Sequence, residues 1–202
     1  GTPGTDAILE YTGTIATTTA RIHQLDIPDD VPLPSPCSNR EYVQRLDDVA
    51  TSSFVDGCVS SALGDPRRLR ESLQADFWTR HEKRVLHGDC QPKNFLFAAT
   101  GEIIVMDLSY GRGHPLHDIA HFLVQLDRIH WRLPLPKTRR LLKLIERTFL
   151  ARYEQHGLDY LMDDLPFFEQ WAMTFSLLKD ERHSWLARQY IRAILGRSVL
   201  FP

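Results

Sequence analysis

Apolar residues recur at helical spacing through the first part of the chain. Between Asp6 and Leu25 they follow the helical period, which predicts a helix over this range. The β-branched run Thr17–Thr19 lowers the helix propensity within it. Four prolines between Pro28 and Pro36 then predict an extended connection.

Two further helices are expected before the middle of the chain. Ser38–Glu41 has the form of a capping box and predicts a helix that runs to about Ser61. Asp65 before Pro66 provides an N-cap and a first-turn proline, and apolar residues at four-residue spacing continue this third helix to Phe77.

The pattern changes at Val85. Val85–Leu86 and Phe95–Phe97 are short apolar runs, and Ile103–Met106 is a β-branched run that ends on Asp107. Thr100–Gly101 has turn-forming composition between the last two runs. We therefore expect a small β-hairpin region within a helical body.

Helical patterns return from Asp118 to the C-terminus. Their apolar positions are Ile119, Phe122, Leu123 and Leu126; Leu141, Leu142, Ile145, Phe149 and Leu150; Phe168, Trp171, Phe175 and Leu178; and Trp185, Tyr190, Ile191 and Leu195. The predicted fold class is α+β and mainly α. It has a helical segment over 1–84, a β region over 85–118 and a second helical segment over 119–202.

Composition limits the classes of function. With 202 residues and 43% hydrophobic residues the chain can bury one sizeable core, and a net charge of −2 gives no field that would attract nucleic acid. No apolar stretch approaches the roughly 18 residues of a membrane-spanning helix, so we expect no membrane partner. Three widely spaced cysteines suggest no disulfide framework, and a cytoplasmic location fits best.

The candidate catalytic residues lie in segment 87–94, His-Gly-Asp-Cys-Gln-Pro-Lys-Asn. Asp89 and Asn94 lie five residues apart, the spacing of a kinase catalytic loop in which the Asp accepts the hydroxyl proton and the Asn binds Mg²⁺. Asp107 follows 13 residues after Asn94 (107 − 94), and a hairpin between them would fold its carboxylate back beside Asn94. An amide oxygen and a carboxylate suffice for Mg²⁺ when waters and phosphates complete its shell.

Three pieces of the chain together resemble the aminoglycoside phosphotransferase and choline kinase-like family, small-molecule relatives of the protein kinases. They are His87–Asn94, Ile104–Asp107 and Gly113–Ala120. The resemblance implies the C-terminal lobe of a protein-kinase-like fold and an ATP-dependent transfer of phosphate to the hydroxyl of a small molecule.

The resemblance also implies roles for five residues. Asp89 is the expected catalytic base, and Asn94 and Asp107 are the expected Mg²⁺ ligands. His87 and Asp118 are expected to support the catalytic loop by hydrogen bonding.

Other readings of the same region stay open. His117 and His121 are four residues apart with an acid between them, a pattern similar to the zinc-binding H-E-x-x-H helix, although Asp118 is one methylene shorter than Glu. A zinc-dependent hydrolase and an inactive kinase-like scaffold are therefore alternatives. Cys90 lacks any support as a nucleophile beyond its position, and we expect a small buried residue there.

The nucleotide-binding features of a kinase N-terminal lobe are missing from this sequence. The first lysine of the chain is Lys83, and the opening Gly1–Thr5 lacks the G-x-G-x-x-G spacing. We expect this polypeptide to begin near the hinge between lobes and to lack the N-terminal nucleotide lobe, which would then be a partner of this chain.

The acceptor molecule is weakly specified. In the family the acceptor lies against the helices after the Gly113–Asp118 segment, and cationic acceptors meet acidic side chains there. Glu169 and Asp180 are the candidates we retain for this role.

Overall fold

The computed structural model describes residues 3–28, 30–33, 84–109, 111–133 and 135–156, together with Leu165, Phe168, Glu169 and Ala172. The chain forms two compact units, one from Gly1–Pro36 with Lys83–Leu165 and one from Cys37–Glu82 with Pro166–Pro202. The helices and strands whose bounds are given below belong to the first unit. The predicted subdivision into 1–84, 85–118 and 119–202 stays a prediction.

Helix α1 spans Pro3–His23 and confirms the helix predicted over Asp6–Leu25. Asp6 lies in its first turn and Arg21 in its last, where each charge complements the helix dipole. The helix continues through the threonine run, and threonine hydroxyls along it donate to carbonyls four residues earlier. Thr12 donates to the carbonyl of Ile8 at 2.8 Å, and Thr19 to that of Ile15 at 2.9 Å.

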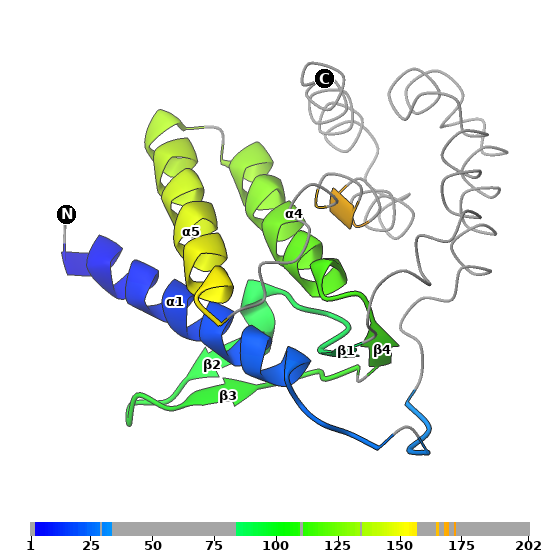
Figure 1. The fold of residues 1–202 in the computed structure, drawn as a ribbon. Helices are drawn as coiled ribbons and strands as arrows, with labels where there is room; N and C mark the ends of the chain where they lie inside the picture. The colour runs from blue at the N-terminus through cyan, green and yellow to red at the C-terminus, as the bar shows by residue number, and fades with distance from the viewer. Residues whose placement is uncertain are drawn as a thin grey trace, which may run out of the picture. The chain divides into compact units, whose positions relative to one another are not determined.

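Helices α4 (Leu116–Arg132) and α5 (Pro136–Glu154) follow each other through a short turn and lie side by side (Figure 1). The apolar positions predicted for the first of them are buried: Ile119, Phe122, Leu123 and Leu126. In α5 the side chains of Leu142, Ile145, Phe149 and Tyr153 are buried, while the basic residues of the same helix are exposed. Helix α5 is therefore amphipathic, and burial of its apolar side holds it against the core.

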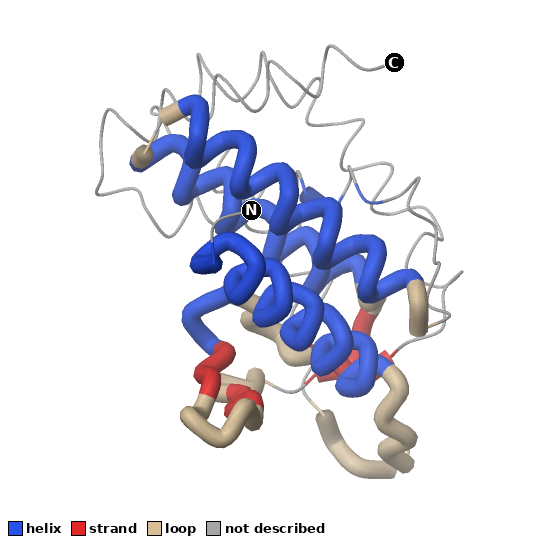
Figure 2. The backbone as a smooth tube through the Cα atoms, turned by 90° about the vertical axis from the view of Figure 1, so that its left-hand side faces the viewer, coloured by secondary structure: helices blue, strands red, loops and turns tan. Residues whose placement is uncertain are grey.

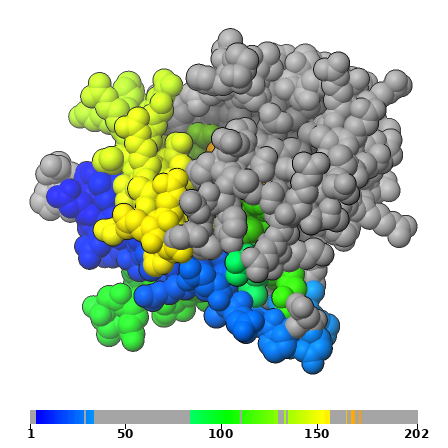
Figure 3. All heavy atoms as spheres, in the orientation of Figure 1, coloured from blue at the N-terminus to red at the C-terminus, as the bar shows by residue number. Residues whose placement is uncertain are grey.

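Aromatic rings fill the space between these helices. Phe122 of α4 and Phe149 of α5 stack with centroids 4.1 Å apart, and Phe149 continues to Tyr153 at 6.4 Å. Helix α1 packs along α5, as the adjoining surfaces in Figure 3 show, and its His23 meets the edge of Tyr153. The core among the described residues therefore joins α1, α4 and α5.

The described part of the chain contains two small antiparallel sheets, and both lie beside α1 (Figures 1 and 2). Strand β1 (Arg84–Leu86) pairs with β4 (Gly111–Gly113), and β2 (Phe95–Phe97) pairs with β3 (Ile103–Val105). The 3₁₀ turn η2 (Pro92–Asn94) precedes β2 directly. The predicted hairpin is confirmed.

The hydrophobic pattern did not predict strand β4, because its sequence is Gly-Arg-Gly and contains no apolar side chain. Glycine has a steric reason at position 113: a Cβ there would lie 2.8 Å from Leu86 Cδ1, so the side chain of Leu86 occupies that space. The close approach of β4 to β1 therefore requires a residue without a side chain at this position.

Several expected helices lie outside the described residues. These are Ser38–Ser61 and the helix from Pro66 to Phe77, together with most of the segments predicted after Leu165. Within the described part of the chain, no helix combines the length and apolar character needed to cross a lipid bilayer.

The aromatic stack yields a stability prediction. Phe149→Ala should lower the free energy of unfolding by about 3–5 kcal/mol, because it removes a fully buried ring and leaves a cavity against Phe122. Leu144→Ala on the exposed side of the same helix is the control and should cost about 0.5 kcal/mol or less. Urea unfolding followed by circular dichroism measures both, and equal losses would contradict this account of the core.

Candidate active site

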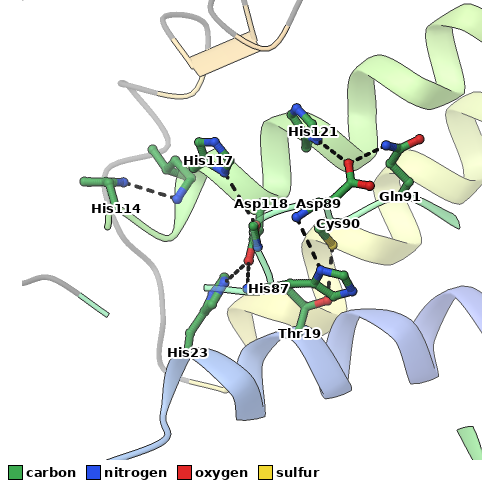
Figure 4. A network of polar contacts seen from close by, with 12 residues as sticks. Thr19, His23, His87, Asp89, Cys90, Gln91, His114, His117, Asp118 and His121 are labelled. Atoms are coloured by element: carbon green, nitrogen blue, oxygen red, sulfur yellow. Dashed lines mark hydrogen bonds and ion pairs between the residues drawn. The ribbon is translucent and has the colours of Figure 1, made fainter. Parts of the chain in front are cut away.

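The loop after β1 is anchored by one buried carboxylate, that of Asp118 in the first turn of α4. The carboxylate accepts hydrogen bonds from the backbone N–H of His87 at 2.6 Å and of Gly88 at 3.0 Å. His23 Nε2, from the end of α1, lies 3.0 Å from the same group (Figure 4). Burial alone would raise the pKa of Asp118, but contacts with His117 and His23 outweigh it and hold this pKa well below its usual range.

The network extends beyond Asp118 to the third helix. His23 Nδ1 lies 2.7 Å from the hydroxyl of Tyr153 in α5. Tyr153, His23 and Asp118 therefore form a continuous buried chain from α5 through α1 to the loop.

Gly88 gives the loop its sharp turn. Its φ is +83°, a conformation that L side chains rarely adopt, and a Cβ there would lie 2.8 Å from the carbonyl oxygen of Ser109. The Ser109 N–H donates to the carbonyl of His87 at 2.9 Å, so the segment that follows Asp107 runs against the loop at this point. Only glycine fits without displacement.

His87 is fully buried and packs against Phe95, with ring centroids 5.4 Å apart. Its Nδ1 accepts a hydrogen bond from the backbone N–H of Asp89 at 3.3 Å. The ring thereby fixes the backbone on which the Asp89 side chain is carried.

Asp89 keeps 26% of its side chain exposed and has three side-chain partners. Gln91 Nε2 donates to Oδ1, His121 Nδ1 lies 3.5 Å from the same oxygen, and Asn94 Nδ2 donates to Oδ2 at 3.1 Å. Burial would raise the pKa of Asp89, yet the bonds from His121, Gln91 and Asn94 together lower it well below its ordinary value. The carboxylate is an ionised acceptor at neutral pH.

The hairpin brings Asn94 and Asp107 to the same end of β2 and β3. Phe95 pairs with Val105, and the Met106 N–H donates to the carbonyl of Asn94 at 2.9 Å, so Asp107 comes directly after the last paired position. Asp107 is exposed and has a φ of +50°, a conformation that costs a non-glycine residue roughly 1–2 kcal/mol. Such strain concentrates at functional positions.

These two residues fit a Mg²⁺ ion by donor type. The Asn94 amide donates to the Asp89 carbonyl at 2.8 Å and to its carboxylate, so its remaining polar atom is Oδ1. Oδ1 and the exposed Asp107 carboxylate are hard oxygen donors, the kind that Mg²⁺ binds.

The zinc reading of His117 and His121 fails on the position of the acid between them. Both oxygens of Asp118 accept hydrogen bonds from the loop backbone, so this carboxylate cannot serve as the general base of a metallohydrolase. Among the described residues, no group of three His, Cys, Asp or Glu side chains could hold a metal ion.

The remaining candidates are placed as follows. Cys90 is fully buried beside Thr19, with Sγ 3.7 Å from the hydroxyl, and burial raises the pKa of its thiol; this confirms the expected small buried residue. Glu169 is half-buried and belongs to the second compact unit. Asp180 lies outside the described residues.

The sequence did not predict the contacts that His23 makes with Asp118, or those that Gln91 and His121 make with Asp89. The four-residue spacing of His117 and His121 placed both on one side of a helix, but it suggested a metal. His23 gave no comparable signal, because its partner Asp118 is 95 residues away in the sequence.

Comparison with known proteins agrees with this geometry. Residues 2–160 match the model of a family described as the phosphotransferase enzyme family. The chain belongs to this family. A comparison with curated protein sequences gives no significant match.

Solved structures share the fold of this phosphotransferase family member. Glucosamine kinase in complex with glucosamine, ADP and inorganic phosphate is 20% identical, with a TM-score of 0.64 over 98% of this chain and 53% of that one. A second crystal form of glucosamine kinase gives 18% identity, a TM-score of 0.65 and coverage of 98% and 54%. Choline kinase LicA from Streptococcus pneumoniae is 14% identical, with a TM-score of 0.64 over 98% of this chain and 66% of that one. The chain thus spans about half the length of the glucosamine kinases and has an α+β kinase-like fold.

The turn at Gly88 and the hairpin turn at Gly101 offer a matched pair of glycine variants. Gly88 and Gly101 have almost the same φ, +83° and +85°. Of the two, only Gly88 has atoms within 4 Å of the position that a Cβ would take. Gly101→Ala should therefore cost about 1 kcal/mol of backbone strain, and Gly88→Ala roughly 1–3 kcal/mol more from the clash with Ser109. Urea unfolding of both variants measures the difference, and a Gly101 variant that is as unstable as the Gly88 variant would refute the steric account.

His117 predicts a pH dependence of stability. Burial lowers the pKa of this imidazole, with partial opposition from Asp118, whereas the unfolded chain titrates near 6.5. The unfolded state therefore binds the proton more readily, and stability falls as the pH drops below about 6.5. His117→Gln should reduce the loss of unfolding free energy between pH 7.5 and 5.5, as measured by urea titration at both values. Asp118 titrates only at far lower pH, so its contribution is constant in this window; identical pH slopes in variant and wild type would rule the effect out.

Proposed function

We propose that this chain is the C-terminal, catalytic lobe of an ATP-dependent phosphotransferase that transfers the γ-phosphate to a hydroxyl group of a small molecule. The observation that carries the proposal is the position of the partly exposed carboxylate of Asp89. It lies beside Asn94, at the base of the hairpin that presents Asp107. Family membership and the kinase-like fold support it.

The assignment to one lobe rests on coverage and on chemistry. The chain aligns over 98% of its own length with 54% of a glucosamine kinase, and its catalytic-loop motif lies within that aligned part. The lysine that pairs with the nucleotide phosphates in this fold has no counterpart before Lys83, so it would come from an N-terminal lobe acting as the partner of this chain.

Asp89 serves the reaction chiefly by orientation. Phosphoryl transfer passes through a loose transition state in which the attacking hydroxyl keeps its proton until late, so the base must hold the hydroxyl in line more than withdraw its proton early. A carboxylate whose pKa is lowered by three hydrogen-bonding partners is a weak base and a well-fixed acceptor. These properties suit a residue that aims the acceptor oxygen.

Asn94 and Asp107 would hold Mg²⁺ through Oδ1 and the carboxylate. A Mg²⁺ ion held by these two residues would supply positive charge beside the phosphate oxygens of the nucleotide. His87 and Asp118 support this arrangement through the backbone of the loop, since they fix the N–H groups of residues 87, 88 and 89.

The similar structures support a proposal for the acceptor class. They are a glucosamine kinase with bound glucosamine and a choline kinase, and both glucosamine and choline carry a cationic nitrogen and at least one hydroxyl group. We propose an amino sugar or amino alcohol as the acceptor of this chain, with Glu169 and Asp180 as acidic partners of the nitrogen.

The decisive test is phosphate transfer from γ-labelled ATP with Mg²⁺. The chain is expressed with the coding sequence that adjoins it in its native reading frame and is offered a panel of amino sugars and amino alcohols. Asp89→Ala should lower kcat about 10²- to 10⁴-fold because the hydroxyl loses its acceptor, and Asp107→Ala should raise the Mg²⁺ concentration required.

His156→Ala, on the turn after α5 where the ring contacts Thr17, is the control and should retain wild-type transfer. Undiminished transfer in the Asp89 variant would refute its assignment. Absence of transfer to every acceptor by the wild type would favour the scaffold alternative.

A further inference from the structure

Helix α4 places two histidines against two different carboxylates. His117 and His121 are one turn apart on the same side of the helix, and their rings stack with centroids 5.3 Å apart and planes at 14° (Figure 4). His117 Nδ1 lies 3.5 Å from Asp118, whereas His121 Nδ1 lies 3.5 Å from Asp89. The first histidine faces the anchor of the loop and the second faces the residue that would meet the acceptor.

The Asp89 carboxylate is held from both of its oxygens. Gln91 and His121 contact Oδ1, and Asn94 contacts Oδ2. Gln91 and Asn94 belong to the same 87–94 segment as Asp89. His121 comes from α4 and joins the carboxylate to that helix.

Burial strengthens this contact. The His121 side chain is 5% exposed, so solvent and salt screen its interaction with the carboxylate far less than they would at the surface. The stacked ring of His117 on one side restricts the orientation of the His121 imidazole. A buried, restrained ring can hold the Asp89 side chain in one rotamer, which a solvated partner could not.

We propose that His121 is a positioning residue for phosphoryl transfer, which fixes the Asp89 carboxylate against α4 so that its exposed edge points to the acceptor hydroxyl. The proposal deepens the proposed function and rests on it. It predicts that loss of the ring affects the chemical step and leaves nucleotide binding unchanged, because the carboxylate that His121 contacts is the one that would orient the acceptor hydroxyl.

The kinetic test compares three proteins in the transfer assay described above. His121→Ala should lower kcat roughly 10- to 100-fold with KM for ATP unchanged, since a small misplacement of the acceptor group slows the reaction. His121→Asn keeps an amide nitrogen at the position of Nδ1 and should restore most of kcat. His156→Ala is the matched histidine control and should behave as wild type. A His121→Ala variant with normal kcat, or an asparagine variant no better than alanine, overturns the proposal.

A second readout does not require activity. In the ¹⁵N-histidine NMR spectrum of the chain, Asp89→Asn should shift the ring signals of His121 and leave those of His156, which contacts Thr17, in place. Unmoved His121 signals overturn the proposal even if transfer is observed. A wild type without transfer to any acceptor defeats the proposed function and the kinetic role with it, and a shifted ring signal would then mark the contact as structural only.

Discussion

The buried carboxylate of Asp118 is the interaction on which the site depends. It is charged, fully enclosed and bonded at once to two backbone N–H groups of the loop and to His23, which continues to Tyr153. An ion in such a place is costly unless its hydrogen bonds are satisfied, and removing one partner typically costs several kcal/mol. The bonds therefore fix the loop to α1 and α5 as well as to α4, and the loop has little freedom to adopt another conformation.

This anchoring explains how short strands support the candidate site. The two sheets among the described residues have two strands each, and an isolated pair of this size is marginally stable. Here the Gly88 turn, the Ser109 contact and the Met106–Asn94 bond join the sheets to the anchored loop. The hairpin can then present Asp107 in a strained conformation, because the surrounding contacts determine its position.

The same helix also decides what the histidines of the region do. Spaced as they are, His117 and His121 are compatible with a metal site, yet each faces a carboxylate whose other contacts are already set. In the proposed phosphoryl transfer Asp89 would orient the acceptor hydroxyl, and this role needs no zinc. The spacing of the two histidines suggests a metal site, whereas the structure places each ring beside a carboxylate.

The sequence by itself determined the elements with strong local signals. The helical period of α1, α4 and α5, the apolar runs of the hairpin and the Asp89, Asn94 and Asp107 spacing are all encoded within short windows, where the hydrophobic pattern and turn residues act directly. Only the tertiary structure decided strand β4, the anchor from His23 to Asp118 and the contact of His121 with Asp89. These join residues up to 95 positions apart, and their formation depends on packing and on the cost of burying charge, which no local pattern records.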